Sequence, residues 1–399
     1  MPIRRERYMK ILITTDWYRP AINGVVTSVE NLRTGLLNAG HEVRVVTLSQ
    51  NLHSWSEDGV YYLASLNMGM VYEKARVKLH VPKDMIRDIL AWGPDVIHSQ
   101  CEFSTFRVAK EVASLCNIPI VHTYHTVYEN YMHYIKLNHK MGVKLAEVLS
   151  RKLLSSTDAV IAPSEKIESM LLRYRVKEPI CVIPSGIDVE QFALDKSSIR
   201  ERIRNEWGIR PDETLLISIG RLAKEKNLDE IISYLKAEHQ GLKLMVVGDG
   251  PHREELEKLA SELGVQEKVI FTGMVSPDEV ADYYPVGDIF VSASRSETQG
   301  LTYMEAMSSG LPLLCHDDEC LDDVIQDGEN GYLYRSEDEF MQKLDALVGD
   351  EDLRKEMGRK ACEYMRRRYS IETFADSCLA VYRDAIWRRG NAYECREAL

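Results

Sequence analysis

The sequence predicts an α/β protein built from two doubly wound parallel sheets. Short apolar runs alternate with helical periodicity, the pattern of buried parallel strands joined by crossover helices. This pattern runs to about residue 188 and then restarts, and 399 residues is more than one core usually holds. We therefore expect an N-terminal domain over 1–188 and a C-terminal domain over 189–372, with a helix at about 373–395 that packs back on the first domain.

The N-terminal domain shows a series of apolar runs that read as strands. They are 10–15, 41–47, 94–99, 119–123, 158–162 and 180–183. A helix is expected from Val25 to Ala39, with Gly40 just after its end. Asn23 and Gly24 open this helix at the end of the loop that follows the first strand, where an open α/β sheet places its ligand. The loop lacks the G-x-G-x-x-G spacing, which disfavours a plain dinucleotide domain.

A histidine follows the expected strand at 119–123. A lone histidine is usually structural, but His125 lies in a loop at the carboxyl end of a buried strand, which makes it a candidate functional residue. Tyr128, Tyr131 and Tyr134 come next, and they fit a packed aromatic stripe equally well.

Residues 68–92 alternate basic and apolar side chains, and Trp92 closes the run. One interpretation is a helix with a solvated basic face. The other is an amphipathic surface that docks on anionic lipid.

The second domain begins with expected strands at 215–219, 244–247, 269–273 and 288–292. Arg221 and Lys226 lie five residues apart in the loop after the first of these strands. They are placed to converge on a diphosphate, with arginine as a fork and lysine as a point charge. Taken alone, they would also fit an exposed basic turn.

Glu297 and Glu305 are separated by seven residues in the segment after the strand at 288–292. The pattern predicts strand, loop and helix, with Glu297 on the loop and Glu305 inside the helix.

The N–H groups of Gln299, Gly300 and Leu301 would then point out of that helix N-terminus, which is an anion site. Two exposed glutamates are common in any strand-loop-helix unit. Beside a phosphate cradle, however, they suit a ligand with hydroxyls and phosphates, such as a sugar nucleotide.

Composition excludes several classes of protein. The net charge of −12 disfavours a nucleic-acid partner. Residues 1–194 carry 23 basic and 20 acidic residues, and residues 195–399 carry 27 and 42, so only the N-terminal half suits an anionic surface. No run has the length of a membrane span. Eight cysteines without C-x-x-C pairs indicate free thiols in a reducing compartment and no zinc site.

Several of these motifs, taken together, resemble the retaining glycosyltransferases of family 4, which have the GT-B fold. They are Asn23-Gly24, His125, the run 183–188, Gly220-Arg221, Glu225-Lys226-Asn227, the run 248–251, and Glu297 and Glu305 with Gly300-Leu301. The resemblance covers nearly the whole chain and implies two Rossmann-like domains that face each other across a cleft. Within the family, the run 124–129 is most similar to bacterial diacylglycerol α-glucosyltransferases.

The resemblance implies roles for the residues of the C-terminal domain. Glu297 would hold hydroxyls of the donor sugar, and Glu305 would bind the ribose hydroxyls. Arg221 and Lys226 would neutralise the diphosphate, so that no divalent metal and no cofactor are needed. The backbone amides of Gln299, Gly300 and Leu301 would add to this.

In the N-terminal domain, the resemblance places His125 near the C6 hydroxyl of the donor sugar and the reaction centre. Gly24 would allow the backbone to approach the phosphates closely. The family often has two glycines in this loop, and here Asn23 takes the place of the first.

The implied reaction is the transfer of glucose from UDP-glucose to diacylglycerol with retention of the α configuration. The enzyme would be cytoplasmic and peripheral on the inner face of the cell membrane, with residues 68–92 on anionic lipid. The alternatives are another nucleotide sugar with a soluble or different lipid acceptor, a sugar-nucleotide epimerase or hydrolase, and a catalytically silent scaffold subunit.

Overall fold

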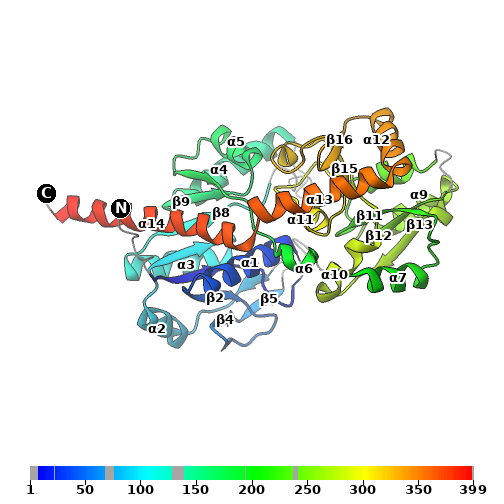
Figure 1. Ribbon diagram of the computed structural model, residues 1–399. Helices are drawn as coiled ribbons and strands as arrows, with labels where there is room; N and C mark the ends of the chain where they lie inside the picture. Colours follow the sequence, from blue (N-terminus) through cyan, green and yellow to red (C-terminus); the bar gives the residue numbers. More distant parts are fainter. Residues whose placement is uncertain are drawn as a thin grey trace. The chain divides into compact units, whose positions relative to one another are not determined.

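The computed structural model describes residues 8–21, 23–67, 76–127, 139–193, 195–236 and 241–397. The chain divides into two compact units, which are labelled by their elements in Figure 1. Unit 1 comprises Met1–Gly186 and Ile371–Leu399, and unit 2 comprises Ile187–Ser370. Each unit contains a largely parallel sheet with helices, so the predicted fold class is confirmed.

Within the described residues, unit 1 has an eight-stranded sheet in the order β10-β9-β8-β7-β1-β2-β4-β3. All neighbouring strands are parallel except β3 and β4. The strands are β1 (Lys10–Thr14), β2 (Glu42–Leu48), β3 (Trp55–Glu57), β4 (Val60–Leu63), β7 (Val96–Ser99), β8 (Ile120–Thr123), β9 (Ala159–Ala162) and β10 (Ile180–Val182). A separate antiparallel pair is formed by β5 (Ser65–Asn67) and β6 (Arg76–Lys78).

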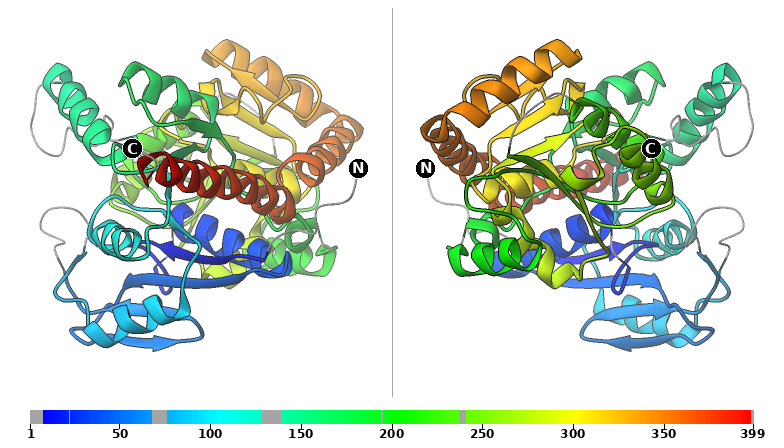
Figure 2. Two further views of the ribbon diagram at one scale, coloured as in Figure 1. Left: turned by 90° about the vertical axis from the view of Figure 1, so that its left-hand side faces the viewer. Right: turned by 90° about the vertical axis from the view of Figure 1, so that its right-hand side faces the viewer.

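The helices of unit 1 are α1 (Gly24–Asn38), α2 (Lys83–Trp92), α3 (Ser104–Cys116), α4 (His139–Leu154), α5 (Glu165–Arg173) and α14 (Ile371–Glu397). α14 runs alongside α1 (Figure 2) and packs on it at Gly35, where an added Cβ would lie 2.7 Å from Ile371 and 2.9 Å from Ala375. The α14 residues Cys378 and Tyr382 are fully buried in the core of unit 1. The last helix of the chain therefore completes the first unit.

The stretch 68–92 is not one helix. Residues 68–75 lie outside the described residues, Arg76–Lys78 is a strand, and the helix begins only at Lys83. The apolar residues Met85, Ile89 and Trp92 of α2 are buried, so the helix turns its apolar stripe inward and leaves its basic residues outside.

Unit 2 has, among the described residues, a six-stranded parallel sheet in the order β13-β12-β11-β14-β15-β16. Its strands are β11 (Thr214–Ile219), β12 (Leu242–Val247), β13 (Val269–Gly273), β14 (Ile289–Ser292), β15 (Leu313–His316) and β16 (Gly331–Tyr334). Its helices are α6 (Val189–Ala193), α7 (Ser197–Glu206), α8 (Leu228–Tyr234), α9 (Arg253–Glu262), α10 (Pro277–Tyr283), α11 (Leu301–Ser308), α12 (Glu337–Gly349) and α13 (Glu351–Arg368). Short 3-10 turns are η2 (Lys224–Lys226), η3 (Gln266–Lys268), η4 (Tyr284–Val286) and η5 (Glu319–Leu321).

The strand order of each sheet reverses at one point. In unit 2, β11 lies between β12 and β14, and in unit 1, β1 lies between β2 and β7. At such a point the connections on the two sides diverge, which opens a crevice at the carboxyl ends of the strands. The predicted site residues of each unit follow strands near its switch point. None of the helices within the described ranges has the length and apolar character to cross a bilayer.

Candidate functional site

The loops after β11 and β14 meet in unit 2 through an ion pair. Lys226 Nζ lies 2.5 Å from Glu297 Oε1. Ser294 Oγ donates to the same carboxylate oxygen at 2.7 Å, and Ser296 Oγ donates to the carbonyl oxygen of Glu225 at 3.3 Å. The two loops are thus tied to each other at the switch point by side chains that the sequence places 71 residues apart.

Glu297 is kept ionised by this arrangement. Burial by itself would raise the pKa of Glu297, but the charge of Lys226 and the hydrogen bonds from Lys226 and Ser294 hold that pKa below its ordinary value. An ionised carboxylate accepts hydrogen bonds only, so it is suited to binding hydroxyl groups.

Glycines bring the loops of β11 and β12 into direct contact. Gly248 has φ +133°, and a Cβ there would lie 2.0 Å from the carbonyl oxygen of Gly220. A Cβ on Gly250 would lie 2.3 Å from the carbonyl oxygen of Leu222, whose N–H donates to Asp249 O at 2.9 Å. Any other residue at these two positions would push the loops apart, because backbone atoms cannot give way.

Arg221 is exposed and forms an ion pair with Glu225. Asn227 ends the η2 turn with φ +54°, and its side chain donates to Glu230 at 2.7 Å. Asn tolerates the left-handed region and can therefore occupy the position between η2 and α8. Arg221 and Lys226 both lie on this connection from β11 to α8.

Glu230 connects three loops of unit 2. Besides Asn227, it accepts hydrogen bonds from Arg295 and from the hydroxyl of Tyr334, each at 2.9 Å. These donors come from the loop after β11, the loop after β14 and the end of β16. Glu230 therefore holds together the two loops that carry Lys226 and Glu297.

α11 begins at the far end of the Glu297 loop. Gly300 precedes the helix with φ +75°, and a Cβ on it would lie 2.2 Å from the ring of Tyr303. Gln299 is buried, and its amide nitrogen contacts Met304 Sδ at 3.0 Å. In any helix the first N–H groups lack an intrahelical acceptor, so those of Leu301 and Thr302 face outward along the axis, while the N–H of Tyr303 donates to the carbonyl oxygen of Gly300 at 3.1 Å.

Glu305 lies inside α11 and accepts a hydrogen bond from the hydroxyl of Tyr284. Burial raises the pKa of Glu305 to about 7, although the hydrogen bond from Tyr284 acts in the opposite direction. The carboxyl group therefore changes its charge near neutral pH, and it would gain from donors that stabilise the ionised form.

In unit 1, a hydrogen-bonded chain of histidine and glutamine side chains lies at the carboxyl ends of the strands. His125 Nε2 lies 2.6 Å from Gln100 Oε1, and Gln100 Nε2 lies 3.1 Å from His98 Nε2. The other nitrogen of His98 contacts the hydroxyl of Tyr382 at 2.6 Å. Burial lowers the pKa of His125 to about 4 against the opposing charge of Glu102, so the ring is neutral at pH 7.

Glu102 and His122 lie close enough to His125 to affect its pKa. Both are buried, and His122 Nε2 lies 3.5 Å from Glu102 Oε1. Asp16 accepts backbone N–H bonds from Ser104 at 2.9 Å and from Thr105 at 2.7 Å, which places its carboxylate at the start of α3. Carboxylates and imidazoles thus gather at the carboxyl ends of β1, β7 and β8.

Gly24 is the first residue of α1 and is exposed. Asn23 caps the helix, since its side chain accepts the N–H of Val26 at 3.0 Å. The departure from two glycines is therefore explained locally, because Asn23 has extended backbone and serves as the N-cap.

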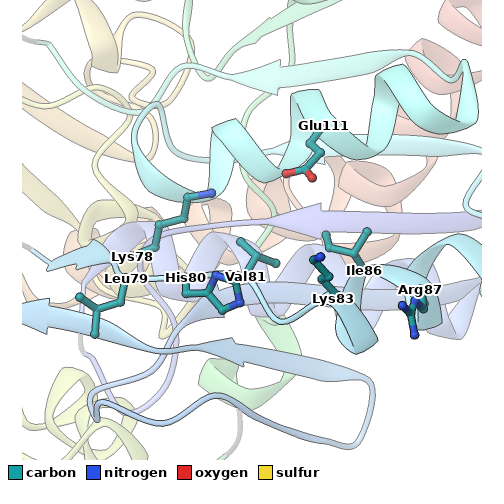
Figure 3. Close-up of a pocket in the computed structure, with 8 residues that line it drawn as sticks. All are labelled: Lys78, Leu79, His80, Val81, Lys83, Ile86, Arg87 and Glu111. Carbon is teal, nitrogen blue, oxygen red and sulfur yellow. The ribbon is translucent and has the colours of Figure 1, made fainter.

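A basic pocket lies between the end of β6, α2 and α3 (Figure 3). Its volume is about 530 Å³. It is lined by Lys78, Leu79, His80, Val81, Lys83, Ile86, Arg87 and Glu111.

The predicted site residues fall into two groups. In unit 2, Lys226 and Glu297 are in contact, and the same two loops and α11 carry the other predicted residues, which are Arg221, Gln299, Gly300, Leu301 and Glu305. Gly24 and His125 belong to unit 1 and follow β1 and β8. Tyr128, Tyr131 and Tyr134 lie outside the described residues.

Sequence reasoning missed several residues of these sites. They are Gln100 and Glu102 in unit 1 and Glu230, Tyr284 and Ser294 in unit 2. The rule that selected His125 would have found Gln100 and Glu102, which follow the buried strand at 94–99. Tyr284 comes from a distant segment, and no local pattern indicates it.

Comparisons with known proteins identify the family. The family model described as Glycosyltransferase Family 4 matches residues 22–191, and the model described as Glycosyl transferases group 1 matches residues 199–364. Alpha-monoglucosyldiacylglycerol synthase of Streptococcus pneumoniae is 35% identical, over 95% of this chain and 86% of the relative. The Acholeplasma laidlawii protein of the same name is 30% identical, over 95% and 98%.

The fold is also similar to solved structures. Anabaena Alr3699/HepE in complex with UDP-glucose has a TM-score of 0.73 at 16% sequence identity, over 95% of this chain and 100% of that one. The two Rossmann-like sheets thus have the GT-B fold, and the family models make the chain a glycosyltransferase. More narrowly, the chain belongs to glycosyltransferase family 4 and is a retaining hexosyltransferase that uses a nucleotide-sugar donor. The predicted family and enzyme class are confirmed.

Proposed function

We propose that the chain transfers glucose from UDP-glucose to diacylglycerol and forms α-monoglucosyldiacylglycerol. The observation that carries this proposal is the 35% identity with an alpha-monoglucosyldiacylglycerol synthase over 95% of this chain. UDP-glucose as the donor is supported by its presence in the HepE complex, a protein of similar fold.

Unit 2 binds the nucleotide and the diphosphate in this proposal. Lys226 and Arg221 neutralise the diphosphate, and the amides at Gly300 and Leu301 donate to it from the start of α11. Glu305 accepts hydrogen bonds from the ribose hydroxyls. As the sugar leaves, negative charge grows on the diphosphate, so these fixed cations and dipoles stabilise the transition state more than the ground state. Charge stabilisation from the chain itself takes the place of a divalent metal.

Two groups hold the sugar. Glu297 accepts hydrogen bonds from its hydroxyls, which the ionised state of this carboxylate favours. His125, neutral at pH 7, exchanges a hydrogen bond with the C6 hydroxyl without adding positive charge beside the developing oxocarbenium ion. Gly24 gives the phosphates room against the start of α1.

The reaction replaces one C–O bond by another on the same face of the sugar. The bond from the anomeric carbon to the diphosphate oxygen breaks with both electrons leaving on UDP. The acceptor hydroxyl oxygen bonds to the anomeric carbon, and its proton passes to the departing phosphate oxygen. Attack from the side that the leaving group vacates retains the α configuration.

The acceptor is drawn from a membrane surface. Lys78, Lys83 and Arg87 line the basic pocket of unit 1 (Figure 3), and these cations complement an anionic headgroup. We place the enzyme on the inner, cytoplasmic leaflet, where the sugar nucleotide is supplied.

The test is turnover of UDP-glucose with diacylglycerol in mixed micelles that contain anionic lipid, with the anomeric configuration of the product determined by NMR. We expect an α-glucosyl lipid and one UDP per product. If UDP is released without a glycolipid, the acceptor is wrong, and soluble acceptors and other nucleotide sugars are tested next. A donor converted without any acceptor would indicate an epimerase or hydrolase, and donor binding without turnover a silent subunit.

A further inference from the structure

α4 exposes a stripe of bulky apolar side chains. Met141 is 62% exposed, Leu145 38%, Val148 43% and Leu149 52%. Their spacing of four, three and one residues places them on one face of the helix. In both views of Figure 2, α4 (blue-green) projects outward from unit 1.

The buried face of α4, which adjoins this stripe, carries small side chains. Gly142, Ala146 and Ser150 are buried, and the hydroxyl of Ser150 contacts that of Tyr124 at 2.7 Å. These small residues let α4 pack closely on the core of unit 1. Leu154, at the end of the helix, is buried in the same core. An ordinary surface helix puts its large apolar residues inward, whereas α4 buries three small residues and leaves four large apolar ones exposed.

The charges around the exposed stripe are mainly positive. From Met141 on, the sequence of α4 contains Lys144, Arg151 and Lys152 against a single acidic residue, Glu147. Lys152 follows Val148 by four residues, so it continues the stripe at the carboxyl end of the helix. Apolar side chains flanked by lysine and arginine are the composition of a helix that lies in an anionic membrane interface.

We propose that α4 inserts its outer face, formed by Met141, Leu145, Val148 and Leu149, into the headgroup region of an anionic bilayer. This deepens the proposed function by naming the apolar contact, and it rests on that function only for the presence of a membrane. The basic pocket beside α2 supplies charge, but Met85, Ile89 and Trp92 of α2 are buried and cannot insert. The two surfaces therefore have different salt dependence, since only charge attraction is screened.

The experiment measures partitioning of the full chain onto vesicles of phosphatidylcholine and phosphatidylglycerol that contain no diacylglycerol. The variant is Leu145→Gln/Leu149→Gln, and the matched control is Leu115→Gln/Leu172→Gln, which alters two other exposed leucines of unit 1 at 60% and 59% exposure. We expect at least about a 10-fold lower partition coefficient for the α4 variant, because apolar area no longer leaves water. The control should partition like the parent.

The salt dependence separates the two surfaces. In roughly 0.5 M salt the parent should retain part of its binding while the α4 variant loses nearly all of it, since attraction at the basic pocket is screened. Thermal unfolding with and without UDP verifies that the variant is folded. The smaller change Val148→Thr provides a second test, with a loss of about threefold expected.

Equal partitioning of parent and α4 variant at both salt concentrations would overturn the proposal. So would a parent that binds no vesicle. If sedimentation velocity finds a dimer that Leu145→Gln/Leu149→Gln dissociates, a second copy of the chain covers this face and no bilayer is needed. Because donor and acceptor are absent from the assay, failure of the proposed glucosyl transfer leaves its result unaffected.

Discussion

The two units share a doubly wound sheet but equip its switch point with opposite chemistry. Unit 2 holds charged groups, Lys226 and Glu297, on loops that glycines bring into contact. Unit 1 holds the neutral ring of His125 on an amide and imidazole network that ends at Tyr382. In the proposed function, this difference assigns the cationic contact with the diphosphate to unit 2 and a neutral contact with a sugar hydroxyl to His125 of unit 1.

The strongest test of this comparison is Lys226→Ala. We expect kcat to fall on the order of 100-fold or more, because one preorganised donor to the leaving group is lost. The measurement is steady-state glucosyl transfer with the donor saturating. Lys224→Ala is the matched control, since this exposed lysine lies on the same η2 turn. Activity of Lys226→Ala within about twofold of the parent would remove the lysine from the mechanism.

The glycine contact in unit 2 is tested by Gly248→Ala. The new methyl group would collide with the carbonyl oxygen of Gly220, at a φ that L-residues rarely adopt. We expect a loss of about 2–3 kcal/mol in the free energy of unfolding of unit 2, measured by thermal and urea unfolding. Gly349→Ala is the control, because nothing lies within 4 Å of its added Cβ. Equal stability of the two variants would show that the loops are free to separate.

In unit 1, substitution of His125 should reduce activity less than substitution of Lys226 does. His125→Ala should reduce kcat/KM by about 10-fold, the value of one hydrogen bond to substrate. Because burial lowers the pKa of His125 to about 4, while Glu102 and His122 face the ring, its contribution should be constant from about pH 6 to 8 and fall as the pH approaches 4. The pH profiles of parent, His125→Ala and the exposed-site control His53→Ala provide the measurement. A step near pH 6.5 that His125→Ala removes would contradict a neutral ring.

The smallest effect concerns Glu305, whose pKa burial raises to about 7. Such a raised pKa stabilises the fold at low pH, and the contribution is lost as the pH rises through about 7. Ribose hydroxyls donate to the ionised form, so UDP should bind several-fold more tightly at pH 8 than at pH 6 and release a proton below pH 7. Calorimetry in two buffers with different ionisation enthalpies measures this proton. Because the terminal phosphate of UDP itself ionises at about pH 6, Glu305→Gln should bind UDP with a reduced pH dependence, and an unchanged slope in that variant would assign the whole dependence to another group.

Much of the architecture could be predicted from local pattern. The buried strands are apolar on both faces, so the runs 10–15, 119–123 and 215–219 mark their own positions. The secondary structure of the basic stretch 68–92 was harder to predict, because its mixture of basic and apolar residues fits a strand such as β6 and a helix such as α2. Of the two interpretations of this stretch, the helix was wrong for Arg76–Lys78, which form a strand.

The site residues that could be predicted are those that follow a recognisable strand. Glu297 and Lys226 follow strands that flank a switch point, so topology alone brings their loops together. Their ion pair, and the contact of Tyr284 with Glu305, depend on packing between segments distant in sequence, which no spacing encodes. The same limit applies to Gln100, whose place between His125 and His98 is set by the sheet order.

The position of α14 bears on how the chain is made. Its residues Phe374, Cys378 and Tyr382 belong to the core of a unit whose strands are synthesised first. On the ribosome, unit 2 has its complete sequence before unit 1 does, so we infer that the second unit reaches its native state earlier. The face of α1 on which α14 packs stays uncovered until α14 has been synthesised. Premature termination after residue 370 would therefore release a chain whose N-terminal half is the part exposed to chaperones and proteases.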